Sequence, residues 1–290
     1  MTLYEVTLGP FMEFGFMRRA LVGCLALALG SGPIGTLLVI RRMSLMGDAL
    51  SHAVLPGAAL GFILAGLSIP AMSLGGVAAG LAVALLSGLV TRLTPLREDA
   101  SFAAFYLISL ALGVLLVSTH GSNVDLLHLL FGSILAVDDT ALILIGAIAT
   151  LSVFSLAVIY RPLVVECFDP EFLRAVGGRG ALVHTIFLGL VVLNLVAGFQ
   201  ALGTLMAVGL MMLPAAAARF WVRELWALGA ASSALALASA FLGLLLSYHL
   251  DLPSGPAIVL VAGLAYLGSV LIGTHDSLRT LYFRRRHLEA

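Results

Sequence analysis

Long apolar runs occupy most of this 290-residue sequence, and their length is the feature that most constrains its fold. Of all residues 61% are hydrophobic and 10% are charged, and the mean hydropathy is +1.13, whereas soluble domains carry roughly 25% charged residues. A helix needs about 20 consecutive apolar residues to cross the hydrocarbon core of a bilayer. We therefore expect an all-α, polytopic membrane protein with a single transmembrane domain over residues 1–290.

Nine apolar runs are predicted to span the bilayer. An eight-span count stays open if residues 181–218 form one broken unit or if two short helices are merged. The nine predicted spans lie at about 17–40, 48–66, 69–92, 101–119, 139–160, 181–200, 203–218, 227–249 and 255–273.

The basic residues orient these spans. All 15 are arginines, and a nine-span count places only Arg18 and Arg19 on one side of the membrane and the other 13 on the opposite side. The positive-inside rule makes the arginine-rich side cytoplasmic. The N-terminus is then expected outside the cell and the C-terminus in the cytoplasm. The expected location of the protein is the plasma or inner membrane. Eight spans would scatter the arginines, which favours nine. The net charge is zero, and no nucleic-acid partner is expected.

Two segments differ from simple spans. The apolar run Leu126 to Val137 is too short to cross the bilayer, so we expect a re-entrant or interfacial helix on the outer face. On the inner face, Asp169 and Pro170 are typical of a helix start and Gly177 of a helix end. This short helix would expose Phe172, so it is a candidate docking element.

Asp48 and His52 are the strongest candidates for binding chemistry. They lie four residues apart and would share one face of a helix. A carboxylate in a span costs about 2.5–3.5 kcal/mol, so it needs a partner, water or an ion. Oxygen and imidazole donors suit Mn²⁺, Zn²⁺ or Fe²⁺. The alternative is a helix–helix hydrogen bond, or a pair at the membrane interface near Arg41 and Arg42.

A second group of polar residues lies between the fourth and fifth predicted spans. His120, Asp125 and His128 could capture a metal ion at the outer entrance. Loops at an aqueous face are also commonly polar for solvation alone, so both interpretations stay open. The cysteines Cys24 and Cys167 lie far apart in sequence, and neither a disulfide nor a thiolate metal site is expected.

The sequence contains no Gly-x-x-x-x-Gly-Lys-Ser/Thr phosphate loop. The chain is therefore not expected to be an enzyme or to hydrolyse ATP by itself. If it pumps a solute, the energy comes from an ion gradient or from a partner.

Five segments of this chain match motifs of one family, in the same order. They are Arg41 to Gly57, Leu130 to Ala136, Asp169 to Gly177, Gly203 to Ala216 and Asp251 to Pro256. From about residue 10 to 275 the chain closely resembles this family, the membrane permease subunits of manganese/zinc/iron-type ABC importers.

This resemblance implies an all-helical permease that works as a dimer with a second permease subunit. Two cytoplasmic ATPase subunits would hydrolyse ATP, and an extracytoplasmic binding protein would deliver Zn²⁺ or Mn²⁺, with no permanently bound cofactor. Asp48 and His52 would contact the metal. The residues implied to couple the permease to the ATPase are Asp169, Pro170, Glu171, Phe172, Arg174 and Gly177. The alternatives are a gradient-driven secondary transporter that uses Asp48 and His52 as a proton or ion relay, and a scaffold without a transported ligand.

Overall fold

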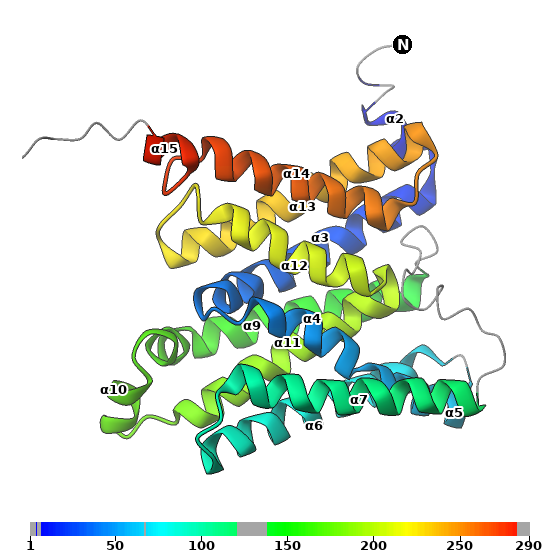
Figure 1. The fold of residues 1–290 in the computed structure, drawn as a ribbon. Coiled ribbons are helices and arrows are strands. Elements are labelled where there is room, and N and C mark those ends of the chain that lie inside the picture. The colour runs from blue at the N-terminus through cyan, green and yellow to red at the C-terminus, as the bar shows by residue number, and fades with distance from the viewer. Residues whose placement is uncertain (1–3, 5–6, 67, 121–137, 283–290) are drawn as a thin grey trace, which may run out of the picture.

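The computed structural model describes residues 4, 7–66, 68–120 and 138–282. All regular elements in this part of the chain are helices, as expected for an all-α protein (Figure 1). Their bounds are α2 Gly9–Glu13, α3 Gly15–Ile40, α4 Ser44–Ala53, α5 Leu55–Ala65, α6 Ile69–Leu93, α7 Glu98–His120, α9 Asp139–Phe168, α10 Pro170–Ala175, α11 Gly180–Leu202, α12 Thr204–Ala218, α13 Leu225–Leu250, α14 Ser254–Ile272 and α15 Leu278–Tyr282.

Eight stretches of the described chain are long and apolar enough to cross a membrane, with α4 and α5 together forming one of them. Each expected span overlaps a helix. The expected span at 203–218 corresponds to α12, which has only 15 residues and rises about 22 Å, less than the roughly 30 Å hydrocarbon core. Whether α12 crosses, and so whether the count is eight or nine, stays a prediction. The expected outer helix at 126–137 lies outside the described residues.

Helices α3 and α11 form the centre of the helix stack. In their most apolar windows 72% and 67% of the residues are buried, against 22% in α7 and α9. Phe187 and Val191 of α11 are fully buried, as are Ile34 and Leu38 of α3. The other helices surround these two and keep large apolar side chains exposed, which is the pattern of surfaces that face lipid or another membrane subunit.

Helix α9 is longer than the sequence analysis expected. Instead of ending near residue 160, it continues through Arg161 and Pro162 to Phe168. At 1.5 Å per residue its 30 residues extend about 45 Å, more than the hydrocarbon core requires. The last turns of α9 therefore reach beyond the apolar layer and bring Glu166 close to the short helix α10.

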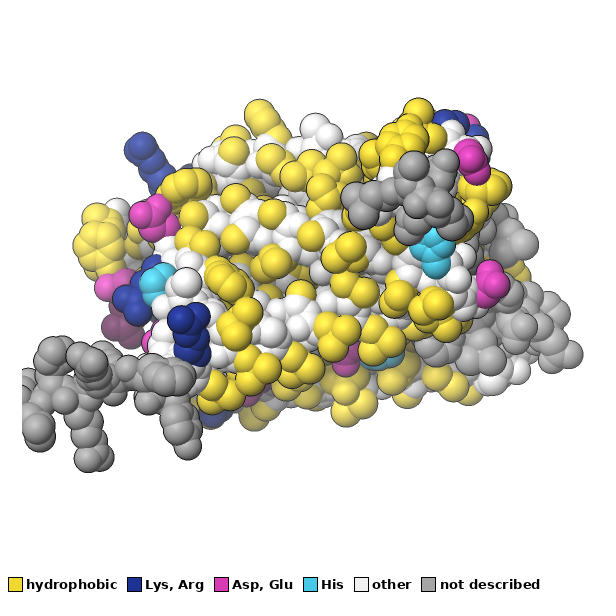
Figure 2. Space-filling view, turned by 90° about the horizontal axis from the view of Figure 1, so that it is seen from above, with side chains coloured by type: hydrophobic (Ala, Val, Ile, Leu, Met, Phe, Trp, Pro, Cys, Tyr) yellow, Lys and Arg dark blue, Asp and Glu magenta, His cyan; other side chains and the backbone are white. Residues whose placement is uncertain are grey.

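The two ends of the stack differ in character. In Figure 1, α10 and α15 lie at one end, while α2 lies at the other end. Figure 2 shows mainly hydrophobic side chains along the length of the helices and most charged side chains towards the ends. We call the end with α10 and α15 the arginine-rich end, because Arg161, Arg174, Arg179 and Arg279 belong to the segments around these helices.

Candidate metal site

Helix α4 presents Asp48 and His52 on one face. The Asp48 Oδ1 and His52 Nε2 atoms are 3.9 Å apart, and the two side chains are 66% and 33% exposed. Two metal–ligand bonds of about 2.1 Å can span up to about 4.2 Å, so a single ion can contact both atoms. Leu45, one turn earlier, is 85% exposed. The face of α4 that carries the pair is thus open rather than packed against the described part of the chain.

Other features of α4 keep this pair oriented. The hydroxyl of Ser51 donates to the backbone carbonyl of Asp48 at 2.7 Å, so this serine is used within its own helix. On the opposite face, Leu50 and Ala53 are fully buried. His52 Nδ1 is buried and has no hydrogen-bond partner among the described residues, which leaves Nε2 as the ring nitrogen that faces Asp48.

The helix breaks directly after His52. Helix α4 ends at Ala53, and Pro56 stands in the first turn of α5, where its missing N–H leaves a carbonyl of the preceding turn without its usual donor. The hydroxyl of Ser109, on α7, donates to the Ala53 carbonyl at 2.9 Å. Gly113, one turn further along α7, lies against Pro56. The break is therefore supported from α7.

The short helix α10 is built as the sequence predicted. Asp169 Oδ1 accepts from the backbone N–H of Phe172 at 2.8 Å and caps the helix. Gly177 has a φ of 75°, a left-handed conformation that favours glycine after a helix. Glu171 and Arg174 are exposed at the two ends of α10.

Helix α10 also displays apolar surface. Phe168, Phe172 and Val176 are 67%, 56% and 65% exposed and are spaced by four residues. The side chain of Leu173 instead packs back against Gly178 and Gly180. Exposed apolar side chains on and beside a short helix with charged residues are typical of a protein-docking surface.

The predicted outer entrance cannot be placed. Helix α7 ends at His120, whose side chain, like Asp125 and His128, lies outside the described residues. Within the part of the chain that the structure describes, no group of three or more His, Cys, Asp or Glu could hold a metal ion. Cys24 is buried in α3 and Cys167 lies at the end of α9.

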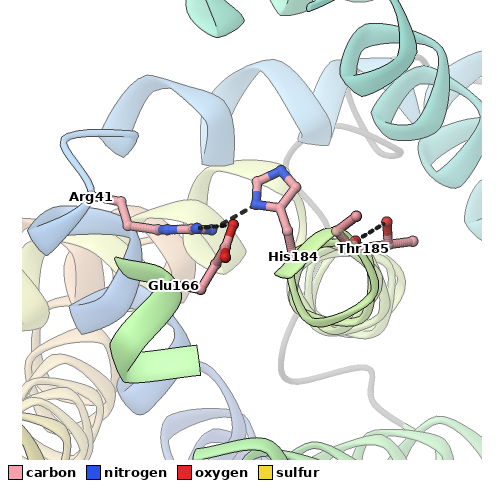
Figure 3. A network of polar contacts seen from close by, with 5 residues as sticks. Arg41, Glu166, His184 and Thr185 are labelled. Atoms are coloured by element: carbon pink, nitrogen blue, oxygen red, sulfur yellow. Dashed lines mark hydrogen bonds and ion pairs between the residues drawn. The ribbon is translucent and has the colours of Figure 1, made fainter. Parts of the chain in front are cut away.

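Sequence reasoning missed two sets of supporting residues. Ser109 is one serine among several in apolar helices, and only its position across from the Pro56 break in the folded chain distinguishes it. The other set joins Arg41, the first residue after α3, to Glu166 and His184 near the arginine-rich end (Figure 3). Arg41 is over 100 positions from the other two residues in sequence. The unusual signal was a carboxylate, Glu166, at the end of an apolar run.

The stack of long apolar helices, with large apolar side chains exposed along it, defines a multi-span membrane protein. Comparison with known proteins agrees with this class. Residues 13–273 match the model of the ABC 3 transport family, and the chain belongs to this family. It is a multi-pass protein of the plasma membrane, and ATP hydrolysis is the task of a separate subunit.

Individual relatives cover nearly the whole chain. The chain is 34% identical to the manganese import system permease protein ScaB of Streptococcus parasanguinis over 260 residues, 90% of this chain and 91% of that one. It is 33% identical to the manganese transport system membrane protein MntC of Listeria innocua over 92% of this chain and 94% of the relative. The solved structure of PsaBC from Streptococcus pneumoniae in complex with Fab superposes with a TM-score of 0.83 at 30% identity, covering 97% of this chain and 100% of that one.

Proposed function

We propose that this chain is the permease subunit of an ATP-driven importer whose cargo is Mn²⁺. Relatives over 30% identical are manganese import and transport proteins by name, which supports manganese. The oxygen and nitrogen donors of Asp48 and His52 suit Mn²⁺, and they suit Zn²⁺ and Fe²⁺ as well. An extracytoplasmic binding protein would deliver the ion, and two cytoplasmic ATPase subunits would supply the energy.

The observation that carries this proposal is the exposure of Asp48 and His52 on one face of α4. A carboxylate that faced hydrocarbon would cost about 2.5–3.5 kcal/mol, so this face needs a partner. A second copy of the chain, related by a two-fold axis along the pore, would bring a second Asp48 and a second His52 to the same place. Two carboxylates and two imidazoles then give the four ligands that a Zn²⁺-like site takes.

The test is uptake of radioactive Mn²⁺ into vesicles that contain the complex assembled with its ATPase and its delivery protein. We expect Asp48→Asn and His52→Ala each to abolish ATP-dependent uptake while the complex still assembles. Asp99→Asn is the matched control, because Asp99 is an exposed carboxylate that pairs with Arg97 at 3.4 Å rather than with a histidine. Full uptake by both site variants would refute the metal role of the pair. Uptake driven by an ion gradient without ATP would favour a secondary transporter.

We further propose that α10 is the contact with the ATPase, with Phe172 as its apolar anchor. This requires the arginine-rich end to be cytoplasmic, with the C-terminus inside and the N-terminus outside. Phe172→Asp should lose ATPase binding or uncouple hydrolysis from transport. Leu278→Asp, on α15, changes a side chain of similar exposure, 51% against 56%, and is the control. Normal assembly and transport in the Phe172 variant would show that α10 is only a linker.

A further inference from the structure

Arg41 joins three helices near the arginine-rich end. Its Nη1 atom lies 2.7 Å from Nδ1 of His184, in the second turn of α11, and its Nη2 atom lies 3.9 Å from Oε1 of Glu166, near the end of α9. The side chains of Arg41 and Glu166 are only 10% and 13% exposed. Figure 3 shows the Arg41 guanidinium pointing towards the Glu166 carboxylate and the His184 imidazole. This is a buried network rather than a surface ion pair.

The chemistry of the three groups defines their roles. A guanidinium can only donate hydrogen bonds, so Nδ1 of His184 accepts, and the imidazole is neutral with its proton on Nε2. The Arg41 guanidinium also lies 5.6 Å from the centre of the Phe187 ring, which favours the cation further. The carboxylate of Glu166 lies against Gly180, the first residue of α11, where the helix dipole favours a negative charge.

The sequence positions of these groups relate the network to both α10 and α4. Glu166 precedes α10 and His184 follows it, so both flanks of α10 contact Arg41. On the other side, α4 begins at Ser44, and the turn between α3 and α4 is tight. In that turn the backbone N–H of Met43 bonds to the Leu38 carbonyl at 2.9 Å. The flanks of α10 are thus connected, through Arg41 and this turn, to the start of the helix that carries Asp48.

We propose that Arg41 is a positioning residue that connects α10 to α4, so that a displacement of α10 by the ATPase moves the metal-binding face. This proposal rests on the proposed function, because it takes α10 as the ATPase contact and Asp48 as a metal ligand. A brace that served stability alone would have the same contacts. The two roles differ in one measurable quantity, the number of metal ions transported per ATP hydrolysed.

The experiment measures Mn²⁺ uptake and ATP hydrolysis in the same vesicles holding the assembled complex. Arg41→Gln removes the cation. Arg42→Gln is the matched control, because Arg42 is the exposed neighbour of Arg41. We expect the ratio of transported metal to hydrolysed ATP to fall by about two- to thirtyfold in Arg41→Gln, the range of mutations in coupled networks, and to stay unchanged in Arg42→Gln.

Two variants of His184 keep the test decisive if Arg41→Gln does not assemble. The amide oxygen of an asparagine occupies about the place of Nδ1, so His184→Asn retains the acceptor and should keep the wild-type ratio. His184→Gln places its oxygen near Nε2 instead and should lower the ratio. A wild-type ratio in His184→Gln would overturn the proposal, and so would a wild-type ratio in an assembled Arg41→Gln complex, even if uptake and hydrolysis fell together. An equal loss in Arg42→Gln would also overturn it. If the wild-type complex shows no ATP-dependent uptake, the proposed function fails instead.

Discussion

Replacing Gly57 by alanine should separate two helices that are packed backbone to backbone. Gly57 of α5 faces Gly75 of α6. A Cβ atom added to Gly57 would lie 2.5 Å from the Gly75 carbonyl carbon and 2.7 Å from the Cβ of Ala79, whereas ordinary contacts begin near 3.4 Å. Because the obstacle is backbone, no side chain can rotate away. The helices would have to move apart by about 1 Å, an overpacking that costs about 1–3 kcal/mol.

Gly88→Ala on α6 is the control, because nothing lies within 4 Å of a Cβ added there. Both substitutions gain about 0.5–1 kcal/mol from the better helix propensity of alanine. The difference between the two variants therefore isolates the overpacking, about 1–3 kcal/mol. For a chain of this size that difference corresponds to roughly 2–12 °C in Tm.

The assay is thermal unfolding of both purified variants in the same detergent, followed by Mn²⁺ uptake in vesicles. Gly57→Ala should unfold at the lower temperature. It should also transport less, because α5 continues from α4 through the Pro56 break and a displaced α5 moves that break. Equal unfolding temperatures for the two variants would refute the close approach of α5 and α6.

Three further predictions concern the supporting residues and the cargo. Ser109→Ala removes the hydrogen-bond donor to the Ala53 carbonyl and should cost about 0.6–1.7 kcal/mol of stability, as for other hydrogen bonds between membrane helices. The check is to measure unfolding and uptake for this variant and for Ser109→Thr, which keeps the hydroxyl. Asp169→Ala removes the cap of α10, worth about 0.5–2 kcal/mol, and should weaken ATPase binding more than Asp169→Asn in a binding titration. Mn²⁺ and Zn²⁺ should each inhibit uptake of the other, because neither ion is excluded by oxygen and nitrogen ligands; a pore that rejected one of them even with a matched delivery protein would contradict this.

Features with a local physical cause could be predicted from the sequence. The apolar runs correspond to helices because a bilayer requires long runs of apolar residues with internal hydrogen bonds. Helix α10 follows from the capping chemistry of Asp169 and the left-handed conformation of Gly177. The end of α9 was predicted too early, since Arg161 and Pro162 are usual signals of a span end. A proline near the end of a long helix removes only one hydrogen bond, and apolar residues continue beyond it.

Contacts between distant segments could not be predicted in the same way. The bond from Arg41 to His184 joins residues 143 positions apart, and no periodicity indicates which arginine meets which acceptor. The sequence analysis treated Arg41 and Arg42 alike, as charges that orient the chain. In the structure only Arg41 turns inward, whereas Arg42 adopts a φ of 59° and stays exposed. Two adjacent arginines thus separate into one that forms a buried network and one that remains at the surface.

The same distinction applies to Asp48 and His52. Their spacing of four residues placed them on one face of a helix, but it did not indicate whether that face is buried within the chain or open. The structure leaves it open, with two donors at a distance that one ion can bridge. An open polar pair on a membrane helix is costly for a single copy, whereas in the proposed dimer two copies around a two-fold axis would cover the face and complete a four-ligand site. Metal binding and the pairing of two permease chains would then depend on the same surface of α4.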